Sequence, residues 1–131
     1  MAKLHHSMIR VLNEARTAAF YAQAFGLKFA HRMDFDDFSL IYLRNDEADF
    51  QLELTVNNGR ETPYELGDGY GHLALNVGDL DAEHARFKAL GFNPRDIKQF
   101  DRDGKKLARF FFVEDPDGYK IEVLERSGYF A

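Results

Sequence analysis

The spacing of apolar and polar residues in the first half of the chain predicts one helix and four strands. Residues 4–12 have the composition of a β-strand. Asn13 is placed to cap a helix that has an apolar stripe, reaches Phe25 and ends at Gly26. Extended segments follow near residues 28–35, 38–44 and 48–57, and the last of them alternates apolar and polar positions. This half therefore predicts a β-α-β-β-β unit.

The second half repeats this order. Residues 71–77 form a predicted strand, and Asp79 caps a helix that reaches Leu90 and stops at Gly91. The remaining strands are expected near residues 93–100, 107–114 and 118–125, the last two joined by the turn-forming residues 115–118. We predict an α+β fold with two tandem βαβββ modules in a single domain. The domain covers residues 1–131, with module 1 at about 4–57, a polar connector at 58–70 and module 2 at about 71–126.

The two modules can be aligned residue by residue. Phe25-Gly26-Leu27 matches Leu90-Gly91-Phe92 at an offset of 65, and Ile9 and Val11 match Leu75 and Val77 at 66. Leu52-Glu53-Leu54 matches Ile121-Glu122-Val123 at 69. The alignment pairs His6 with His72 and Glu53 with Glu122. His5, by contrast, is expected to point to the opposite face of its strand.

This equivalence makes a metal site the best interpretation of the four residues. Two neutral imidazoles and two carboxylates form a mixed nitrogen and oxygen ligand set for a divalent cation. Glu122 lies between Ile121 and Val123 in a strand of apolar character, where a buried carboxylate requires a cation or a hydrogen-bond partner. We therefore predict that His6, Glu53, His72 and Glu122 bind one metal ion.

The amino-acid composition excludes several classes of function and partner. The net charge is −5 and no basic block occurs, so no nucleic-acid or anionic-membrane partner is expected. The absence of cysteine excludes disulfides and thiolate ligands. No apolar run approaches the roughly 18 residues of a membrane span, and charged and polar residues precede any apolar run like that of a signal peptide. A soluble cytoplasmic protein is the expectation.

A set of segments spread over nearly the whole chain has a characteristic composition: Leu4–Val11, Phe20–Tyr21, Phe25–Lys28, Leu52–Thr55 with Asn57 and Gly59, Tyr64–Gly67, Tyr70–Leu75 and Phe112–Glu122. Together these segments resemble the glyoxalase I (lactoylglutathione lyase) family of the vicinal oxygen chelate superfamily. Glu53 is discriminating, since related epimerases tend to carry Gln at this position.

The resemblance implies two modules whose curved mixed sheets surround a metal-binding cleft. It also implies a homodimer in which His6 and Glu53 of one subunit join His72 and Glu122 of the other, giving two sites per dimer. The chain is short and lacks the insertions of zinc-dependent members. It therefore resembles the class that uses nickel or cobalt, although the affinity order does not exclude zinc.

The implied reaction converts the hemithioacetal of methylglyoxal and glutathione to S-lactoylglutathione, which detoxifies methylglyoxal. By resemblance, Glu122 is the catalytic base, and Glu53 serves the opposite face of the substrate or remains a ligand. Arg10 and Asn57 match family positions that hold the γ-glutamyl end of glutathione. Lys105, Lys106 and Arg109 are candidates for binding its glycine carboxylate, and none of them is assigned.

Two alternatives remain open at this stage. The first is another metal-dependent epimerase or isomerase of the superfamily that acts on a different carbonyl compound. The second is a metal-free binding protein similar to the bleomycin-sequestering relatives, against which the four intact ligands argue. An extradiol dioxygenase is less well supported, because such enzymes use two His and one carboxylate to bind iron.

Overall fold

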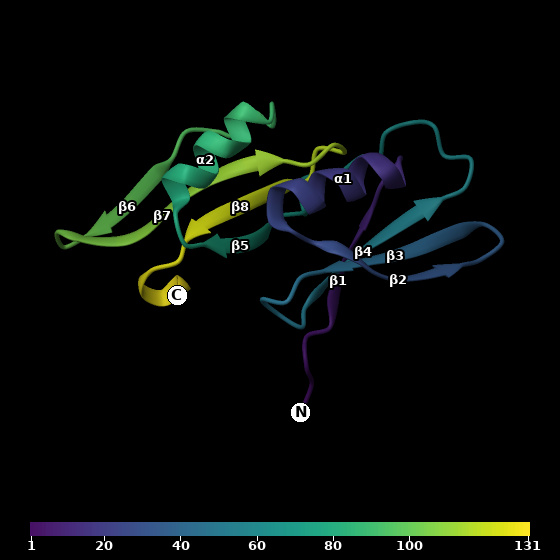
Figure 1. The fold of residues 1–131 in the computed structure, drawn as a ribbon, viewed down its shortest axis with the longest axis horizontal. Coiled ribbons are helices and arrows are strands. Elements are labelled where there is room, and N and C mark those ends of the chain that lie inside the picture. Colours follow the sequence, from purple (N-terminus) through teal and green to yellow (C-terminus); the bar gives the residue numbers. More distant parts are fainter. The chain divides into compact units, whose positions relative to one another are not determined.

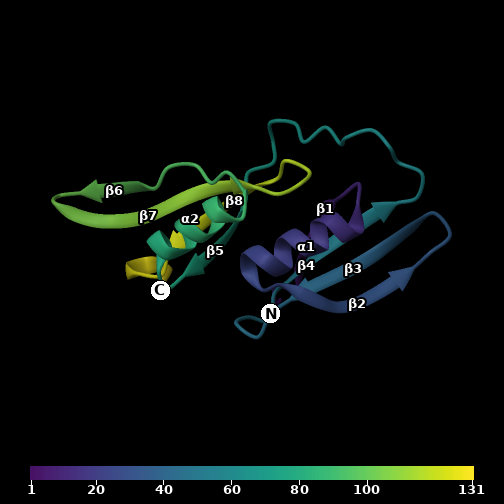
Figure 2. The same ribbon diagram turned by 45° about the horizontal axis from the view of Figure 1, so that its top comes forward.

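The computed structural model describes residues 1–131, and the chain divides into two compact units, Met1–Glu65 and Leu66–Ala131. The division falls inside the predicted connector, residues 58–70. Each unit consists of one helix and one four-stranded sheet, and Figures 1 and 2 show the helix lying over one face of the sheet in each unit. The predicted α+β class and the βαβββ order of both units are confirmed.

In the first unit, the first and last strands pair in parallel and the other pairs are antiparallel. The sheet is therefore mixed, in the order β1-β4-β3-β2. Its elements are β1 (His6–Arg10), α1 (Glu14–Phe25), β2 (Lys28–Asp34), β3 (Phe38–Arg44) and β4 (Gln51–Asn57).

Helix α1 begins and ends where the sequence predicts. The Asn13 side chain accepts a hydrogen bond from the Arg16 N–H at 2.9 Å, which satisfies one of the free donors of the first turn. Gly26 ends the helix in the left-handed conformation at φ 64°. The Arg32 guanidinium of β2 binds the Glu14 carboxylate at the start of α1. Since Arg32 pairs with Ile41 in the sheet, Ile41 also belongs to the helix-covered face.

The second unit repeats this topology with the order β5-β8-β7-β6, and β5 and β8 are the parallel pair. The Asp79 side chain caps its helix by accepting a hydrogen bond from the Ala82 N–H at 3.0 Å. A short 3-10 helix, η1 (Gly128–Phe130), follows the sheet. The other elements are β5 (Leu73–Val77), α2 (Leu80–Ala89), β6 (Lys98–Arg102), β7 (Lys105–Glu114) and β8 (Lys120–Glu125).

The core of the second unit lies between α2 and one face of its sheet. Phe87 of α2 is fully buried and contacts the Phe111 ring at a centroid distance of 5.6 Å. Phe111 pairs with Val123 and Val113 pairs with Ile121, and all four side chains are buried. Glu122, which alternates with Ile121 and Val123 along β8, therefore lies on the face that α2 does not cover.

One predicted strand is misplaced. We expected a strand near residues 93–100, whereas β6 spans Lys98–Arg102. Asn93 adopts a left-handed conformation at φ 54°, which is incompatible with a strand, and the Arg95 N–H donates to the Phe112 carbonyl from a non-strand segment. Strands β1 and β5 are shorter than predicted, so His6 opens β1 and His72 immediately precedes β5.

The predicted turn between β7 and β8 forms around Asp115, which is buried. The Gly118 N–H donates to the Asp115 carbonyl, and the Asp115 carboxylate accepts hydrogen bonds from the backbone N–H groups of Asp117 and Tyr119. The turn thus fixes where β8 begins, two residues before Glu122. Neither α1 nor α2 has the length and apolar character that crossing a bilayer requires.

Gly26 and Gly78 offer a matched test of the left-handed helix end. An added Cβ would meet nothing within 4 Å at either position, but only Gly26 has a positive φ. Gly26→Ala should lower the free energy of unfolding by about 1 kcal/mol, because L residues are disfavoured there. Gly78→Ala should change it by less than about 0.5 kcal/mol. Urea denaturation measures both values, and equal effects would show that backbone conformation is not the cause.

Candidate metal centre

Glu53 lies on the face of the first sheet that α1 leaves uncovered. It occupies β4, between Met8 of β1 and Tyr42 of β3, its partners in the two neighbouring strands. Although no helix covers this face, Glu53 is only 8% exposed. A carboxylate this buried requires polar partners, and the sheet supplies two.

The first partner is His6, whose Nε2 lies 3.2 Å from the Glu53 Oε2. The second is the Tyr42 hydroxyl, which donates a hydrogen bond to the Glu53 carboxylate. That hydrogen bond, together with burial, raises the pKa of the Tyr42 phenol to about 12. The Tyr42 ring also meets the His6 ring edge-on at a centroid distance of 5.7 Å. His6, Tyr42 and Glu53 therefore form one connected cluster across three strands.

His5 does not point away from this cluster, and the prediction that it would is wrong. The His5 Nδ1 lies 2.9 Å from the His6 Nδ1, with the two rings edge to face. Strict alternation fails here because His5 precedes β1, which starts at His6. One of the two Nδ1 atoms must carry the shared proton. With that proton on His5, the His6 Nδ1 accepts it and the His6 Nε2 can donate its own proton to Glu53, a proton that a bound cation would replace.

The second unit holds an equivalent pair. The His72 Nε2 lies 3.6 Å from the Glu122 Oε1. Glu122 pairs with Ala74 of β5 and with Phe112 of β7, and the Phe112 ring meets the His72 ring edge-on at 5.2 Å. The Glu122 side chain is 19% exposed, compared with 10% for Glu53. Phe112, unlike Tyr42, offers its carboxylate no hydroxyl.

Each unit thus brings together one imidazole and one carboxylate. Neither unit by itself holds a group of three or more His, Cys, Asp or Glu side chains that could bind a metal ion. Imidazole nitrogen and carboxylate oxygen suit nickel, cobalt and zinc, so the donor chemistry of each pair fits half of a divalent-metal site. The structure therefore brings the four predicted ligands together as two pairs, here called half-sites, His6 with Glu53 and His72 with Glu122, and metal binding by them stays a prediction.

The two predicted substrate-binding residues share the Glu53 face of the first sheet. Arg10 ends β1 and is exposed, and Asn57 ends β4 and is half-buried. The Asn57 amide donates to the Tyr64 hydroxyl at 2.9 Å, and the Arg60 guanidinium stacks over the Tyr64 ring at 4.3 Å. These contacts fix the orientation of the Asn57 carboxamide.

Two of the basic candidates for the glycine carboxylate are ion-paired within their own unit. Arg109 binds Asp81 of α2 and Glu125 of β8, and Lys106 also binds Glu125. The contact of Arg109 with Asp81 of α2 places Arg109 on the helix-covered side of the sheet, opposite Glu122. Arg109 is therefore a structural residue of the second unit.

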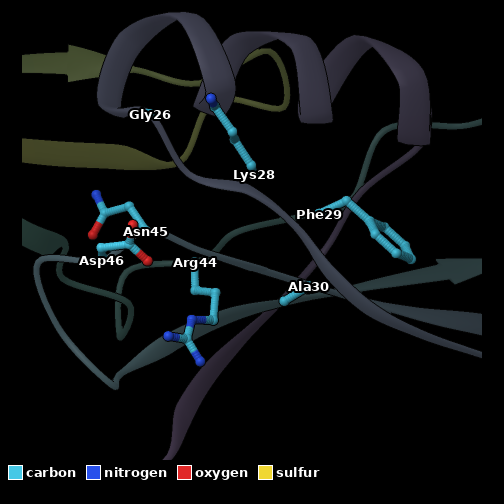
Figure 3. Close-up of a pocket in the computed structure, with 7 residues that line it drawn as sticks. All are labelled: Gly26, Lys28, Phe29, Ala30, Arg44, Asn45 and Asp46. Atoms are coloured by element: carbon cyan, nitrogen blue, oxygen red, sulfur yellow. The ribbon is translucent and has the colours of Figure 1, made fainter.

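A separate open hollow of about 450 Å³ lies at the end of α1, where β2 begins and β3 ends (Figure 3). None of the predicted metal or substrate residues borders it. Figure 3 shows the Lys28 side chain extending toward α1 and the Arg44 side chain extending in the opposite direction. Its lining consists of Gly26, Lys28, Phe29, Ala30, Arg44, Asn45 and Asp46.

Tyr42 is the one site residue that the sequence analysis missed. It lies 11 positions before Glu53, on a different strand, so no local motif connects the two. The internal repeat carried the signal, because Tyr42 matches Phe112 at an offset of 70 and each is the cross-strand partner of the repeated Glu.

The hydrogen bond between Tyr42 and Glu53 predicts an unusually alkaline titration. In protein with ¹³C-labelled tyrosine, the Tyr42 Cζ signal should remain that of a neutral phenol while an ordinary tyrosine, with a pKa of 10.0, ionises. Glu53→Gln should lower the Tyr42 pKa toward that ordinary value, because it removes the charge that favours the protonated phenol. The Tyr42→Phe spectrum assigns the signal. A Tyr42 pKa that Glu53→Gln left unchanged would contradict the hydrogen bond.

Comparisons with known proteins agree with this fold. The profile of the Glyoxalase/Bleomycin resistance protein/Dioxygenase superfamily matches residues 3–123. A lactoylglutathione lyase of Neisseria meningitidis serogroup B is 38% identical, covering 95% of this chain and 91% of the relative. A lactoylglutathione lyase of Pseudomonas aeruginosa is 34% identical, with 94% and 82% covered. The trypanothione-dependent glyoxalase I of Leishmania major superposes with a TM-score of 0.76 at 32% identity, over 95% of this chain and 87% of that one. The chain belongs to the Glyoxalase/Bleomycin resistance protein/Dioxygenase superfamily.

Proposed function

We propose that this protein is a lactoylglutathione lyase, or glyoxalase I. It would convert the hemithioacetal of methylglyoxal and glutathione to S-lactoylglutathione and so detoxify methylglyoxal. The observation that carries the proposal is the pair of equivalent His–Glu half-sites, His6 with Glu53 and His72 with Glu122. Lactoylglutathione lyases that are 34% and 38% identical over most of the chain support the same reaction.

The metal site of this enzyme is completed in a homodimer. Each unit holds only two donors, so a complete set needs one pair from each kind of unit. In a dimer with twofold symmetry, His6 and Glu53 of one subunit meet His72 and Glu122 of the other, and the symmetry makes two such sites. The complete site therefore depends on association of two chains.

A divalent ion, nickel or cobalt in preference to zinc, would be held by these four residues. When bound, it supplies Lewis-acid stabilisation of the negative charge that develops on the substrate oxygens. The imidazoles of His6 and His72 act as fixed ligands. Reaction in the cytoplasm is part of the proposal, since reduced thiols are maintained there.

Glu122 performs the proton transfer between carbons. It takes the proton from the carbon that bears the sulfur and the hydroxyl group, and it returns that proton to the neighbouring carbonyl carbon. The hydroxyl proton moves to the former carbonyl oxygen, so the step is an isomerisation without loss of atoms. Glu122 is suited to this role because its carboxylate is half-buried and its cross-strand partner, Phe112, does not hold it by a hydrogen bond.

The thiol is bound by residues of the first sheet. Arg10 supplies a positive charge for the α-carboxylate of the γ-glutamyl end, and Asn57 supplies a carboxamide whose direction Tyr64 fixes. Both lie on the same face as Glu53. The Leishmania major relative is trypanothione-dependent, which makes trypanothione a useful comparison thiol.

The alternative functions predict different behaviour. A different metal-dependent epimerase or isomerase would bind metal and show no turnover of methylglyoxal with glutathione. A metal-free ligand-binding protein would purify without stoichiometric nickel, cobalt or zinc. The lactoylglutathione lyases that are 34% and 38% identical over most of the chain favour neither alternative.

Apoprotein reconstituted with nickel should form the lactoyl thioester from methylglyoxal and glutathione. The absorbance of the thioester measures this product. Nickel should support a higher rate than zinc. Glu122→Gln keeps an oxygen donor but removes the base, so its kcat should fall by about 10²- to 10⁴-fold. Elemental analysis of the variant checks that the metal remains. Turnover by Glu122→Gln at the wild-type rate would show that Glu122 is not the base.

Subunit complementation tests the shared site. The double variants His6→Ala/Glu53→Ala and His72→Ala/Glu122→Ala should each be inactive. In a mixed dimer of the two, one site combines all four intact donors and the other has none. Random reassortment should therefore restore about a quarter of the wild-type activity per chain. Donors drawn from a single chain would restore none, because every chain in the mixture lacks one pair.

A further inference from the structure

Tyr42 and Phe112 occupy equivalent positions in the two units. Tyr42 is the β3 partner of Glu53, and Phe112 is the β7 partner of Glu122. Each ring also meets the histidine of its own pair edge-on, at interplanar angles of 85° and 83°. Each half-site therefore contains one six-membered aromatic ring, one imidazole and one carboxylate at equivalent positions. The two half-sites differ by one hydroxyl group.

That hydroxyl changes how the two carboxylates are held. Tyr42 is buried beside Glu53 as its cross-strand partner, so its hydroxyl can donate to the Glu53 carboxylate, while His6 approaches the same carboxylate at 3.2 Å. Hydrogen bonds to ionised acceptors are among the stronger ones in proteins. Glu122 has His72 at 3.6 Å and a hydrocarbon ring in place of the phenol. Glu53 thus has two polar partners, His6 and Tyr42, whereas Glu122 has one, His72.

We propose that Tyr42 is a positioning residue that makes the two carboxylates unequal, holding Glu53 as a fixed metal ligand and leaving Glu122 as the mobile base. The assignment of the base rests on the proposed function, whereas the restraint on Glu53 does not. A carboxylate that transfers a proton must shift between the cation and the substrate carbon. Tyr42 is buried at 9% exposure and belongs to the neighbouring strand, so it cannot follow that shift.

A purely packing role for Tyr42 would predict something different. Its ring fills space beside His6 and also lies 6.1 Å from the His31 ring. Tyr42→Phe keeps both ring contacts and removes only the hydroxyl. If Tyr42 had only a packing role, the Tyr42→Phe variant would keep the wild-type metal affinity. Glu53 and Glu122 would also keep the roles that they have in the wild-type protein.

The experiment compares Tyr42→Phe with Phe112→Tyr, which adds the hydroxyl to the other half-site. Calorimetry with nickel and apoprotein measures the restraint without any turnover. Tyr42→Phe should raise the nickel dissociation constant by about 10- to 100-fold, the usual range for loss of a group that orients a metal ligand. Phe112→Tyr should not weaken nickel binding. Circular dichroism confirms that both variants are folded.

Kinetics on the nickel-loaded enzyme then test the assignment of the base. Phe112→Tyr should lower kcat by about tenfold with little change in KM, because it tethers Glu122 after substrate has bound. Glu122→Gln should be less damaging in a Tyr42→Phe background than alone, since a released Glu53 can take over part of the proton transfer. Strictly multiplicative effects of the two substitutions would count against the proposal.

The outcomes separate this inference from the proposed function. Wild-type nickel affinity in Tyr42→Phe overturns the restraint on Glu53, even when the enzyme turns over methylglyoxal and glutathione normally. If nickel-loaded wild-type protein forms no lactoyl thioester, the proposed function and the role of Glu122 as base are both overturned. In that case, weaker nickel binding by Tyr42→Phe still supports the restraint on Glu53. Absence of nickel binding by the wild-type protein overturns both.

Discussion

Parallel pairing of the first and last strands of each βαβββ unit is the constraint on which the site depends. It brings His6 at the start of β1 beside Glu53 in β4, and His72 before β5 beside Glu122 in β8. Parallel strands require a long crossover connection, and here that connection includes the helix and two further strands. The residues of each pair can therefore be 47 or 50 positions apart and still lie within hydrogen-bonding reach or close to it.

In each unit, the same topology places the packed core on one face of the sheet and the His–Glu pair on the other. The helix covers one face of the sheet, where apolar residues such as Leu54 and Phe111 are fully buried. The opposite face carries the imidazole and the carboxylate. Because β-strand side chains alternate, a single strand such as β4 serves both faces at once. The buried side-chain nitrogen and oxygen atoms are all hydrogen-bonded, so burial of Glu53 leaves no orphaned polar group.

The two units hold similar His–Glu pairs, and the hydroxyl group of Tyr42 distinguishes one pair from the other. A symmetric pair of carboxylates would offer two equivalent bases and two equivalent ligands. Tyr42 restrains Glu53, and Phe112 leaves Glu122 without that restraint. The hydrocarbon ring of Phe112 keeps the contact with His72, so the geometry of the imidazole is maintained in both halves. Unequal function can thus arise from a duplicated fold without any change of its backbone.

The sequence by itself determined the elements, their caps, the internal repeat and the equivalence of His6 with His72 and of Glu53 with Glu122. These features depend on local periodicity and on residues such as Asn13, Gly26 and Asp79, whose preferences act over a few neighbours. Local signals failed at residues 93–97, where a left-handed Asn93 replaced the expected strand, and at His5, which lies outside the alternation of β1.

Tertiary structure alone decided which side chains meet. The bond from Tyr42 to Glu53 depends on strand register, and the pairing of Arg109 with Asp81 depends on the docking of a helix. A shift of one residue in register would turn Tyr42 or Arg109 to the other face of its sheet. Register is set by the packing of the whole unit, which is why no short stretch of sequence could reveal these contacts.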